Sequence, residues 1–185
     1  MAGTNRDIEV ARAFHDRTAH SAASVRSSGH ALDWEVRPLP FKVYPDLPEV
    51  PLPTAFDPLA GDALTALAGP APDAAGPLTL GTLAAVLFFS AGLTRKKTYP
   101  GGEETRFRAA PSTGALYQTE VYVVAGAVEG LGAGVYHFSP GDFRLRRLRE
   151  GDYRGALADA AVEPELARRP STLVQIGRAS CRERV

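Results

Sequence analysis

The feature that most constrains the fold is one strongly apolar segment, residues 79–91, which precedes several short segments of strand character. Apolar side chains recur in it at spacings of three and four, the period of a helix with a buried face. They are Leu80, Leu83, Ala84, Leu87, Phe88 and Ala91. Val86 and Phe89 widen the apolar surface, so we expect this helix to be buried on more than one side. Thr79 can cap its start and Gly92 can end it.

Four later segments have strand signals: the first is rich in β-branched and aromatic residues, and in the third apolar and polar residues alternate, as in a half-buried strand. They are residues 120–125, 135–139, 143–148 and 171–176. The turn-forming Pro140-Gly-Asp142 lies between the second and the third, which predicts a hairpin. Further helices are predicted at residues 5–20, 62–68 and 152–162, the last with Asp152 as its cap.

Two stretches are expected to lack regular structure. Residues 21–58 are rich in serine, glycine and proline, and proline excludes long helices, so an extended arm over the surface is predicted. Trp34, Phe41 and Tyr44 are the expected anchors of this arm on the core. Residues 95–104 are polar and contain glycine, which predicts a mobile loop.

Composition excludes several classes of function. The 21 basic and 21 acidic residues leave no formal net charge, so neither nucleic acid nor an anionic membrane is suggested as a partner. The basic clusters at 95–97, 144–149 and 168–169 are expected on solvated faces. A single cysteine, Cys181, allows no disulfide within the chain and makes the cytoplasm the default compartment. The histidines show no metal-ligand spacing, and the apolar stretch at 83–89 is too short to span a bilayer.

The clearest ligand-binding chemistry lies in the segment Arg-Phe-Arg-Ala-Ala-Pro-Ser-Thr-Gly-Ala-Leu-Tyr, which begins at Arg106. Arg106 and Arg108 can pair with a phosphate or a carboxylate. Pro111 presets a turn, Ser112 offers a hydroxyl, and Gly114 lets the backbone approach a flat ligand closely. Such a segment suits an anionic, planar cofactor. Arginine-rich loops are also common on plain solvated surface, and the residues alone leave both interpretations open.

This segment, together with Glu120-Val-Tyr-Val-Val, resembles the flavin-contacting stretch of the nitroreductase superfamily, and within it the SagB/ThcOx type of FMN-dependent dehydrogenase. Further segments resemble that group in the same order, over most of residues 10–175. They are Phe14-His-Asp-Arg-Thr, Leu32-Asp-Trp, Pro40-Phe-Lys-Val-Tyr, Val50-Pro-Leu-Pro, Val128-Glu-Gly-Leu, Gly134-Val-Tyr-His-Phe and Leu148-Arg-Glu-Gly-Asp. The resemblance implies an α+β fold with an antiparallel or mixed sheet flanked by helices.

The resemblance also implies FMN as cofactor and a division of roles among the residues. Those that would line the flavin are Pro111, Ser112, Gly114 and Ala115, with Arg106 and Arg108 nearest its phosphate or ring oxygens. The implied reaction is hydride transfer to the flavin, in the oxidation of peptide thiazolines or oxazolines to azoles. The implied partners are a second nitroreductase-like half or a homodimer partner, a cyclodehydratase and a precursor peptide.

The chain departs from the family in three places. The early Arg-Arg-Ser-x-Arg phosphate element is missing, and residues 69–76, which hold its expected place, contain no basic residue. Arg106, Arg108 or Lys96-Lys97 could substitute for it. Gln118 stands where the family often has proline. The Lys-Tyr pair linked to azoline oxidation would follow residue 176, and no matching pair occurs, so no catalytic residue is assigned within this chain.

The last ten residues, 176–185, resemble translated sequencing-adapter DNA. The expected organisation is therefore a helix and proline-rich arm over 1–58, a nitroreductase-like domain over 59–175 that is incomplete at its C-terminus, and a foreign tail over 176–185. An incomplete sheet is expected to leave the isolated chain poorly soluble or partly folded, and the fragment alone is expected to be inactive. Two alternatives remain open: a non-catalytic partner half that acts as a scaffold, and a general nitro- or quinone reductase.

Overall fold

A computed structural model describes residues 8–27, 41–56, 61–69, 77–112 and 115–177. The chain divides into two compact units, residues 1–37 and 38–185. The first unit contains α1 (Ile8–Thr18), within the predicted first helix, and α2 (Ala22–Ser27). α2 corrects the expectation of an extended arm from residue 21. It forms because Ser21 and Ser24 cap it reciprocally: each backbone N–H donates to the other's hydroxyl, at 2.8 and 3.0 Å.

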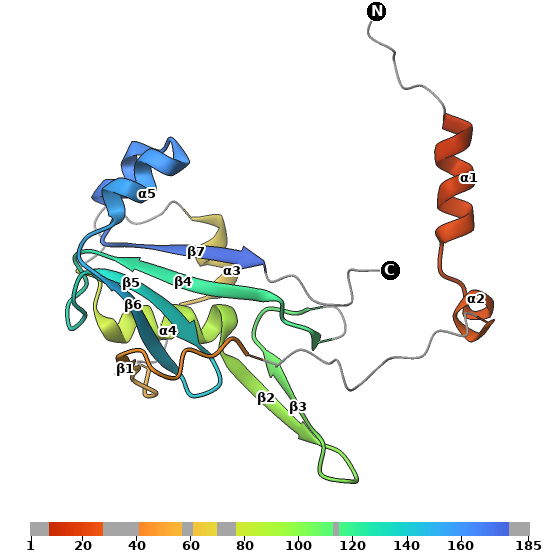
Figure 1. Cartoon of the computed structure of the whole chain (residues 1–185), viewed down its shortest axis with the longest axis horizontal. Coiled ribbons are helices and arrows are strands. Elements are labelled where there is room, and N and C mark those ends of the chain that lie inside the picture. The colour runs from red at the N-terminus through yellow and green to blue at the C-terminus, as the bar shows by residue number, and fades with distance from the viewer. Residues whose placement is uncertain (1–7, 28–40, 57–60, 70–76, 113–114, 178–185) are drawn as a thin grey trace, which may run out of the picture. The chain divides into compact units, whose positions relative to one another are not determined.

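The second unit is built on a five-stranded antiparallel sheet in the order β1-β6-β5-β4-β7 (Figure 1). The strands are β1 (Glu49–Pro51), β4 (Thr119–Ala125), β5 (Gly134–Ser139), β6 (Arg144–Glu150) and β7 (Ser171–Gly177). The four strands predicted from composition are all present, and β5 and β6 form the predicted hairpin. Phe143 is the exception: it was assigned to a strand, but it lies in the turn with a positive φ of 54°.

One face of the sheet is covered by α4 (Leu80–Ala91), which matches the predicted apolar helix. The Thr79 hydroxyl accepts the backbone N–H of Thr82 at 3.1 Å, as a helix cap should, and Gly92 ends the helix. The helix buries Leu83, Ala84, Leu87 and Ala91 against the strands. The strand residues in this core are Val121, Val123, Ala125, Tyr136, Phe138 and Leu145. Val86 and Phe89, which widened the predicted apolar surface, remain 46% and 54% exposed.

The other helices are short: α3 (Ala63–Ala68), α5 (Arg154–Ala161) and the 3₁₀ segment η2 (Pro164–Arg168). The predicted cap of the last α-helix was misplaced by one residue, because Tyr153 occupies that position. Asp152 instead accepts the backbone N–H and the guanidinium of Arg154, and these bonds lower the pKa of Asp152 to about 2. No helix in the described part of the chain is long and apolar enough to cross a membrane.

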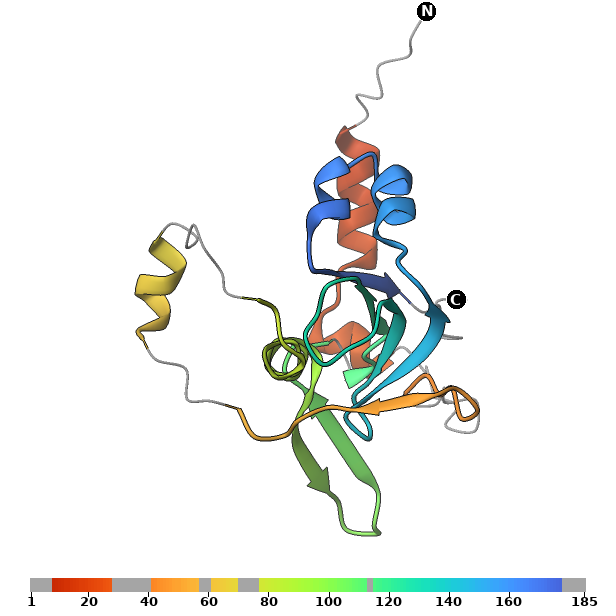
Figure 2. The ribbon, with the colours of Figure 1, turned by 90° about the vertical axis from the view of Figure 1, so that its left-hand side faces the viewer.

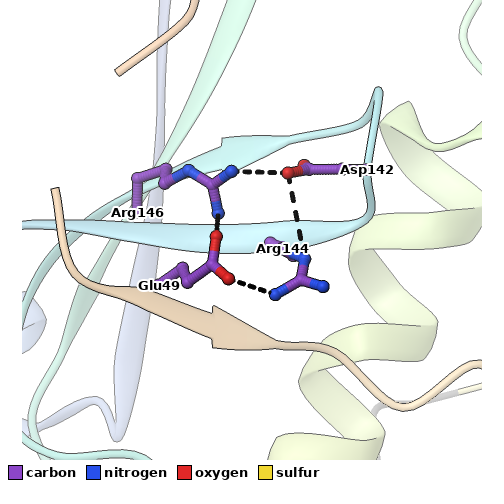
Figure 3. A network of polar contacts seen from close by, with 4 residues as sticks. All are labelled: Glu49, Asp142, Arg144 and Arg146. Carbon is purple, nitrogen blue, oxygen red and sulfur yellow. Dashed lines mark hydrogen bonds and ion pairs between the residues drawn. The ribbon is translucent and has the colours of Figure 1, made fainter. Parts of the chain in front are cut away.

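The end of the proline-rich arm is fastened to the sheet. β1 pairs with β6, and Leu52, the residue that follows β1 in the sequence, is buried. Four charged side chains close over this junction in a network of two carboxylates and two guanidinium groups (Figure 3). The Glu49 carboxylate forms ion pairs with the guanidinium groups of Arg144 and Arg146, the latter at 2.5 Å. The Arg146 guanidinium also forms an ion pair with the Asp142 carboxylate at 2.5 Å. Part of the basic cluster at 144–149 is therefore engaged in holding β1.

Residues 95–104 are not an irregular loop. They form the turn and adjoining strand ends of a separate two-stranded antiparallel hairpin of β2 (Leu93–Thr98) and β3 (Glu104–Arg108). Composition gave no strand signal, because every side chain of β2 after Leu93 is exposed and the apolar alternation is absent. The hairpin is closed locally instead, by the Tyr99 N–H on Glu103 O and by two glycines, Gly101 and Gly102, with φ of 107° and 88°. It projects from the body of the second unit (Figure 2).

Candidate functional site

A cavity of about 320 Å³ lies where the C-terminal end of α4, the end of β3 and the start of β4 meet. Its walls combine apolar surface with hydroxyl, amide and guanidinium groups. The lining residues are Ser90, Ala91, Arg108, Ala110, Pro111, Ser112, Tyr117, Gln118, Thr119, Val121 and Gln175. The volume is at the small end of the range for ligand pockets, about 300–1,000 Å³. The cavity is therefore large enough for part of a flat cofactor.

The wall that follows β3 is held by the main chain. Ala109 N–H donates to Gly92 O at 2.9 Å and Ala110 N–H donates to Ser90 O at 3.1 Å, so the chain leaving β3 is tied to the end of α4. Beyond Ser112, two non-glycine residues, Ala115 and Tyr117, have positive φ values of 52° and 46°. Such backbone persists only where its surroundings hold it, and it is often found at ligand sites.

Ser112 is the side chain that closes this loop. Its hydroxyl accepts the backbone N–H of Tyr117 at 3.0 Å and donates to Oε1 of Gln118 at 3.2 Å. The single donor of the hydroxyl and one of its two acceptor lone pairs are thereby used within the cavity wall. Ser112 thus shapes the cavity as well as facing it.

Replacing Ser112 with alanine should lower the free energy of unfolding by about 1 kcal/mol, because the Tyr117 N–H loses its acceptor. Urea unfolding followed by far-UV circular dichroism measures this. Ser139→Ala is a matched control, since Ser139 is half-buried on β5 and makes no side-chain hydrogen bond among the described residues, and it should change stability by less than about 0.5 kcal/mol. Equal effects of the two substitutions would contradict the loop-closing role.

Arg108 is the one arginine of the motif in the cavity wall. It is only 7% exposed, and its Nη1 donates to Thr119 O at 3.1 Å, which links the end of β3 to the start of β4. Its guanidinium lies 5.6 Å from the Phe41 ring centroid and 5.4 Å from that of Tyr117. The charge is therefore held near two aromatic rings by the Thr119 hydrogen bond and by cation–π contacts.

The other residues singled out by the sequence are distributed as follows. Pro111 lines the cavity beside Ser112, whereas Ala115 is half-buried in the same loop but outside the lining. Arg106 is exposed on β3, outside the lining, and lies 3.4 Å from a Glu104 carboxylate oxygen. Gly114 lies outside the described residues. The structure thus brings Arg108, Pro111 and Ser112 together.

The cavity also contains residues that sequence reasoning did not assign to it. Gln118 was visible only as a departure from proline, yet its amide lies in the wall beside Ser112. Gln175 comes from β7, which pairs with β4 so that Gln175 is opposite Val121. Tyr117, Thr119 and Ser90 carried no separate signal. Strand pairing, which composition does not reveal, places Gln175 here.

A second polar cluster lies on β4 and β5. Nε2 of His137 and Oε2 of Glu120 are 3.1 Å apart, and both residues are buried, with exposures of 0% and 2%. The rings of Tyr44 and Tyr122 lie 5.1 and 5.2 Å from that of His137. The two tyrosine hydroxyls are 3.3 Å apart. Tyr44 is thus an anchor of the arm, as predicted; Phe41 contacts Arg108, and Trp34 lies outside the described residues.

Lys42 completes this cluster at the surface. Its hydrogen bonds to the Tyr44 and Tyr122 hydroxyls raise the pKa of the Lys42 amine. Burial of Tyr122, and to a lesser extent its hydrogen bond with Tyr44, raises the pKa of Tyr122.

Across the described residues, no group of three or more His, Cys, Asp or Glu side chains could hold a metal ion.

The chain is similar to known proteins in sequence and in structure. No protein-family model matches the chain. The chain is 34% identical over 87 residues to a Methanocaldococcus jannaschii protein named "putative nitroreductase", a match that covers 47% of this chain and 40% of that protein. A crystal structure from Anabaena variabilis, also described as a "putative nitroreductase", superimposes with a TM-score of 0.62 and 27% identity. The superposition covers 90% of this chain and 31% of the Anabaena chain. This chain therefore spans less than half the length of either relative.

The structural similarity confirms the predicted α+β fold, an antiparallel sheet flanked by helices. The sequence similarity is to a protein of the same description. Both similarities are thus to proteins described as putative nitroreductases.

Proposed function

We propose that this chain forms part of an FMN-dependent oxidoreductase of the cytoplasm, and that its share of the flavin site is the cavity between α4, β3 and β4. The observation that carries the proposal is that Arg108, Pro111 and Ser112, from the one segment that resembles a flavin-contacting stretch, converge on a cavity. The two nitroreductase-like relatives support the same conclusion.

The donor set fits a flavin. An isoalloxazine ring is flat and apolar on its faces, with hydrogen-bonding atoms along its edges. Ala91, Val121 and the Tyr117 ring supply apolar surface, while Ser112, Gln118 and Gln175 supply hydroxyl and amide groups. Arg108 supplies the positive charge that a phosphate or an electron-rich ring edge requires. The cavity is too small for a whole cofactor, which favours completion of the site by further protein.

The flavin, when bound, would accept or deliver a hydride, and the protein would bind and orient it. In this proposal Ser112 and the strained backbone at Ala115 and Tyr117 keep the wall in one shape. Arg108, fixed by Thr119 O, places a charge that does not have to reorganise during the reaction. Pro111 has no N–H and adds a rigid turn beside these groups.

For the substrate we propose the SagB-type reaction, oxidation of an azoline in a modified peptide. The partners would then be a second nitroreductase-like half or a homodimer partner, with a cyclodehydratase and a precursor peptide. Val86 and Phe89 support the need for a partner half, because these apolar side chains are exposed on one side of α4. A general nitro- or quinone reductase is the alternative that both relatives' names favour. A non-catalytic scaffold half is favoured by the absence of a basic residue over 69–76.

Substitution of Arg108 by glutamine should weaken FMN binding by about tenfold or more, since a charge-assisted hydrogen bond contributes about 1.5–3 kcal/mol. Quenching of FMN fluorescence by the 185-residue chain measures the affinity. Arg106→Gln is the matched control: it removes the same charge from the same motif, but outside the cavity, and should change affinity less than about threefold.

Riboflavin, which lacks the phosphate of FMN, distinguishes a contact of Arg108 with the phosphate from a contact with the ring. If Arg108 pairs with the phosphate, the substitution should weaken FMN but not riboflavin; if it pairs with the ring, both should weaken. Equal effects of the two arginine substitutions would overturn the assignment. An absence of saturable quenching by the chain would favour the scaffold function over a flavin site.

A further inference from the structure

The β2–β3 hairpin is a surface that the flavin site does not use. It projects from the second unit, apart from the five-stranded sheet (Figures 1 and 2). Among the described residues β2 has a single strand neighbour, β3, so its outer edge presents main-chain groups that can pair with an added strand.

The two faces of the hairpin differ in charge. On one face, Lys96 and Arg106 are paired across the strands and share the Glu104 carboxylate, at 2.7 and 3.4 Å. This carboxylate offsets a repulsion that like charges directly opposite each other would otherwise produce. On the other face, Arg95 and Lys97 lie within ion-pairing distance of no carboxylate in the described part of the chain.

Aromatic rings lie beside these two cations. The Arg95 guanidinium is 6.0 Å from the Phe107 ring centroid, and the Lys97 ammonium is 4.4 Å from that of Tyr99. Cation–aromatic contacts hold both charges on the hairpin without neutralising them. The result is a row of two available positive charges with two aromatic rings along an open strand.

The base of the hairpin is part of the cavity wall. β2 begins just beyond Ala91, the last residue of α4, and β3 ends at Arg108. Ala91 and Arg108 both line the cavity. Hydrogen bonds from Ala109 to Gly92 and from Ala110 to Ser90 fix this base to α4. A segment lying along the hairpin therefore has one end near residues that line the cavity.

We propose that the outer edge of β2 is a docking surface for an extended, acidic peptide segment, which pairs with β2 through its main chain and with Arg95 and Lys97 through its carboxylates. Nucleic acid is a poorer fit, because Glu103 and Glu104 lie at the turn end of the hairpin and the whole chain has no net charge. The hairpin then holds a peptide-borne substrate near the cavity. That role rests on the proposed function of the cavity, whereas peptide binding itself can be measured without a cofactor.

Fluorescence anisotropy of a labelled peptide of alternating glutamate and valine tests the inference on the full 185-residue chain. The double substitution Arg95→Glu, Lys97→Glu should weaken binding by about tenfold or more at low salt, because two attractions become repulsions. Both side chains are exposed, so the fold should be retained, which circular dichroism checks; Arg95→Gln, Lys97→Gln is a milder second variant. The matched control is Arg168→Glu, Arg169→Glu, which reverses two exposed charges at the end of η2.

Strand addition is separated from simple charge attraction by a second probe, the same peptide with alternate backbone nitrogens methylated. It keeps every carboxylate but loses main-chain donors, so it should bind about tenfold more weakly than the parent peptide if the backbone pairs with β2. Four results would overturn the inference: no saturable binding by the unmodified chain, equal loss with the hairpin and control variants, equal binding of the methylated peptide, or tighter binding of a single-stranded oligonucleotide.

Discussion

Replacement of Glu120 by alanine is expected to lower the free energy of unfolding by about 3 kcal/mol or more, one of the two largest effects among single substitutions discussed for this chain. The carboxylate lies 3.1 Å from Nε2 of His137, and both residues are buried. Removal of one member of a buried polar pair leaves the other in a low-dielectric site without that partner, and the cost of desolvation is then uncompensated.

Urea unfolding of the wild type and of the Glu120→Ala variant measures this loss. Glu120→Gln keeps the shape and a hydrogen-bonding atom near His137, so it should cost less than half as much. Glu129→Ala removes the same charge from an exposed position on the β4–β5 connection, and should stay within about 0.5 kcal/mol of the wild type. An effect of Glu120→Ala as small as that of Glu129→Ala would show that the pair contributes little to stability.

Replacement of Phe138 by alanine should be of similar or greater size, about 3–5 kcal/mol. Phe138 is 1% exposed and lies in the core between α4 and the sheet, with its ring centroid 5.8 Å from that of Phe143. The substitution removes the transfer free energy of the ring and leaves a cavity that strands on both sides of β5 prevent from closing.

The same residue type on the exposed side of α4 provides the control. Phe89 is 54% exposed, although its ring lies near those of Phe56 and Phe88, and Phe89→Ala should cost about 1 kcal/mol. Urea denaturation of both variants at one temperature gives the two losses in free energy of unfolding, and thermal unfolding checks their order. A loss at position 138 no larger than at position 89 would mean that the sheet and α4 do not form the tightly packed core described above.

The elements that could be predicted from sequence are those whose signal is local. α4 was recognisable because its apolar spacing, its threonine cap and its terminal glycine all lie within the segment itself. β4 was recognisable from its β-branched and aromatic content, and the β5–β6 hairpin from a Pro-Gly-Asp turn and from the alternation that follows it. Physical chemistry within about a dozen residues decides these elements, so no knowledge of the neighbours is needed.

The elements that were missed depend on neighbours. β2 has no buried face and therefore no apolar alternation, and only its pairing with β3 makes it a strand. β1 is three residues long and is held by its register against β6 and by the Glu49–Arg144–Arg146 contacts. Sequence reasoning read one of these strands as a mobile loop and the other as part of an extended arm.

The candidate site divides in the same way. From the residues by themselves one could locate the segment from Arg106 to Tyr117 and name its chemistry, because arginine, proline, serine and glycine at that spacing suit an anionic flat ligand. Which arginine faces the cavity was decided by the tertiary structure: β3 ends at Arg108, whereas Arg106 remains in the exposed hairpin beside Glu104. The register of β4 with β5 and β7, set by packing against α4, brought Glu120 to His137 and Gln175 to the cavity, and no pattern within one strand contains that information.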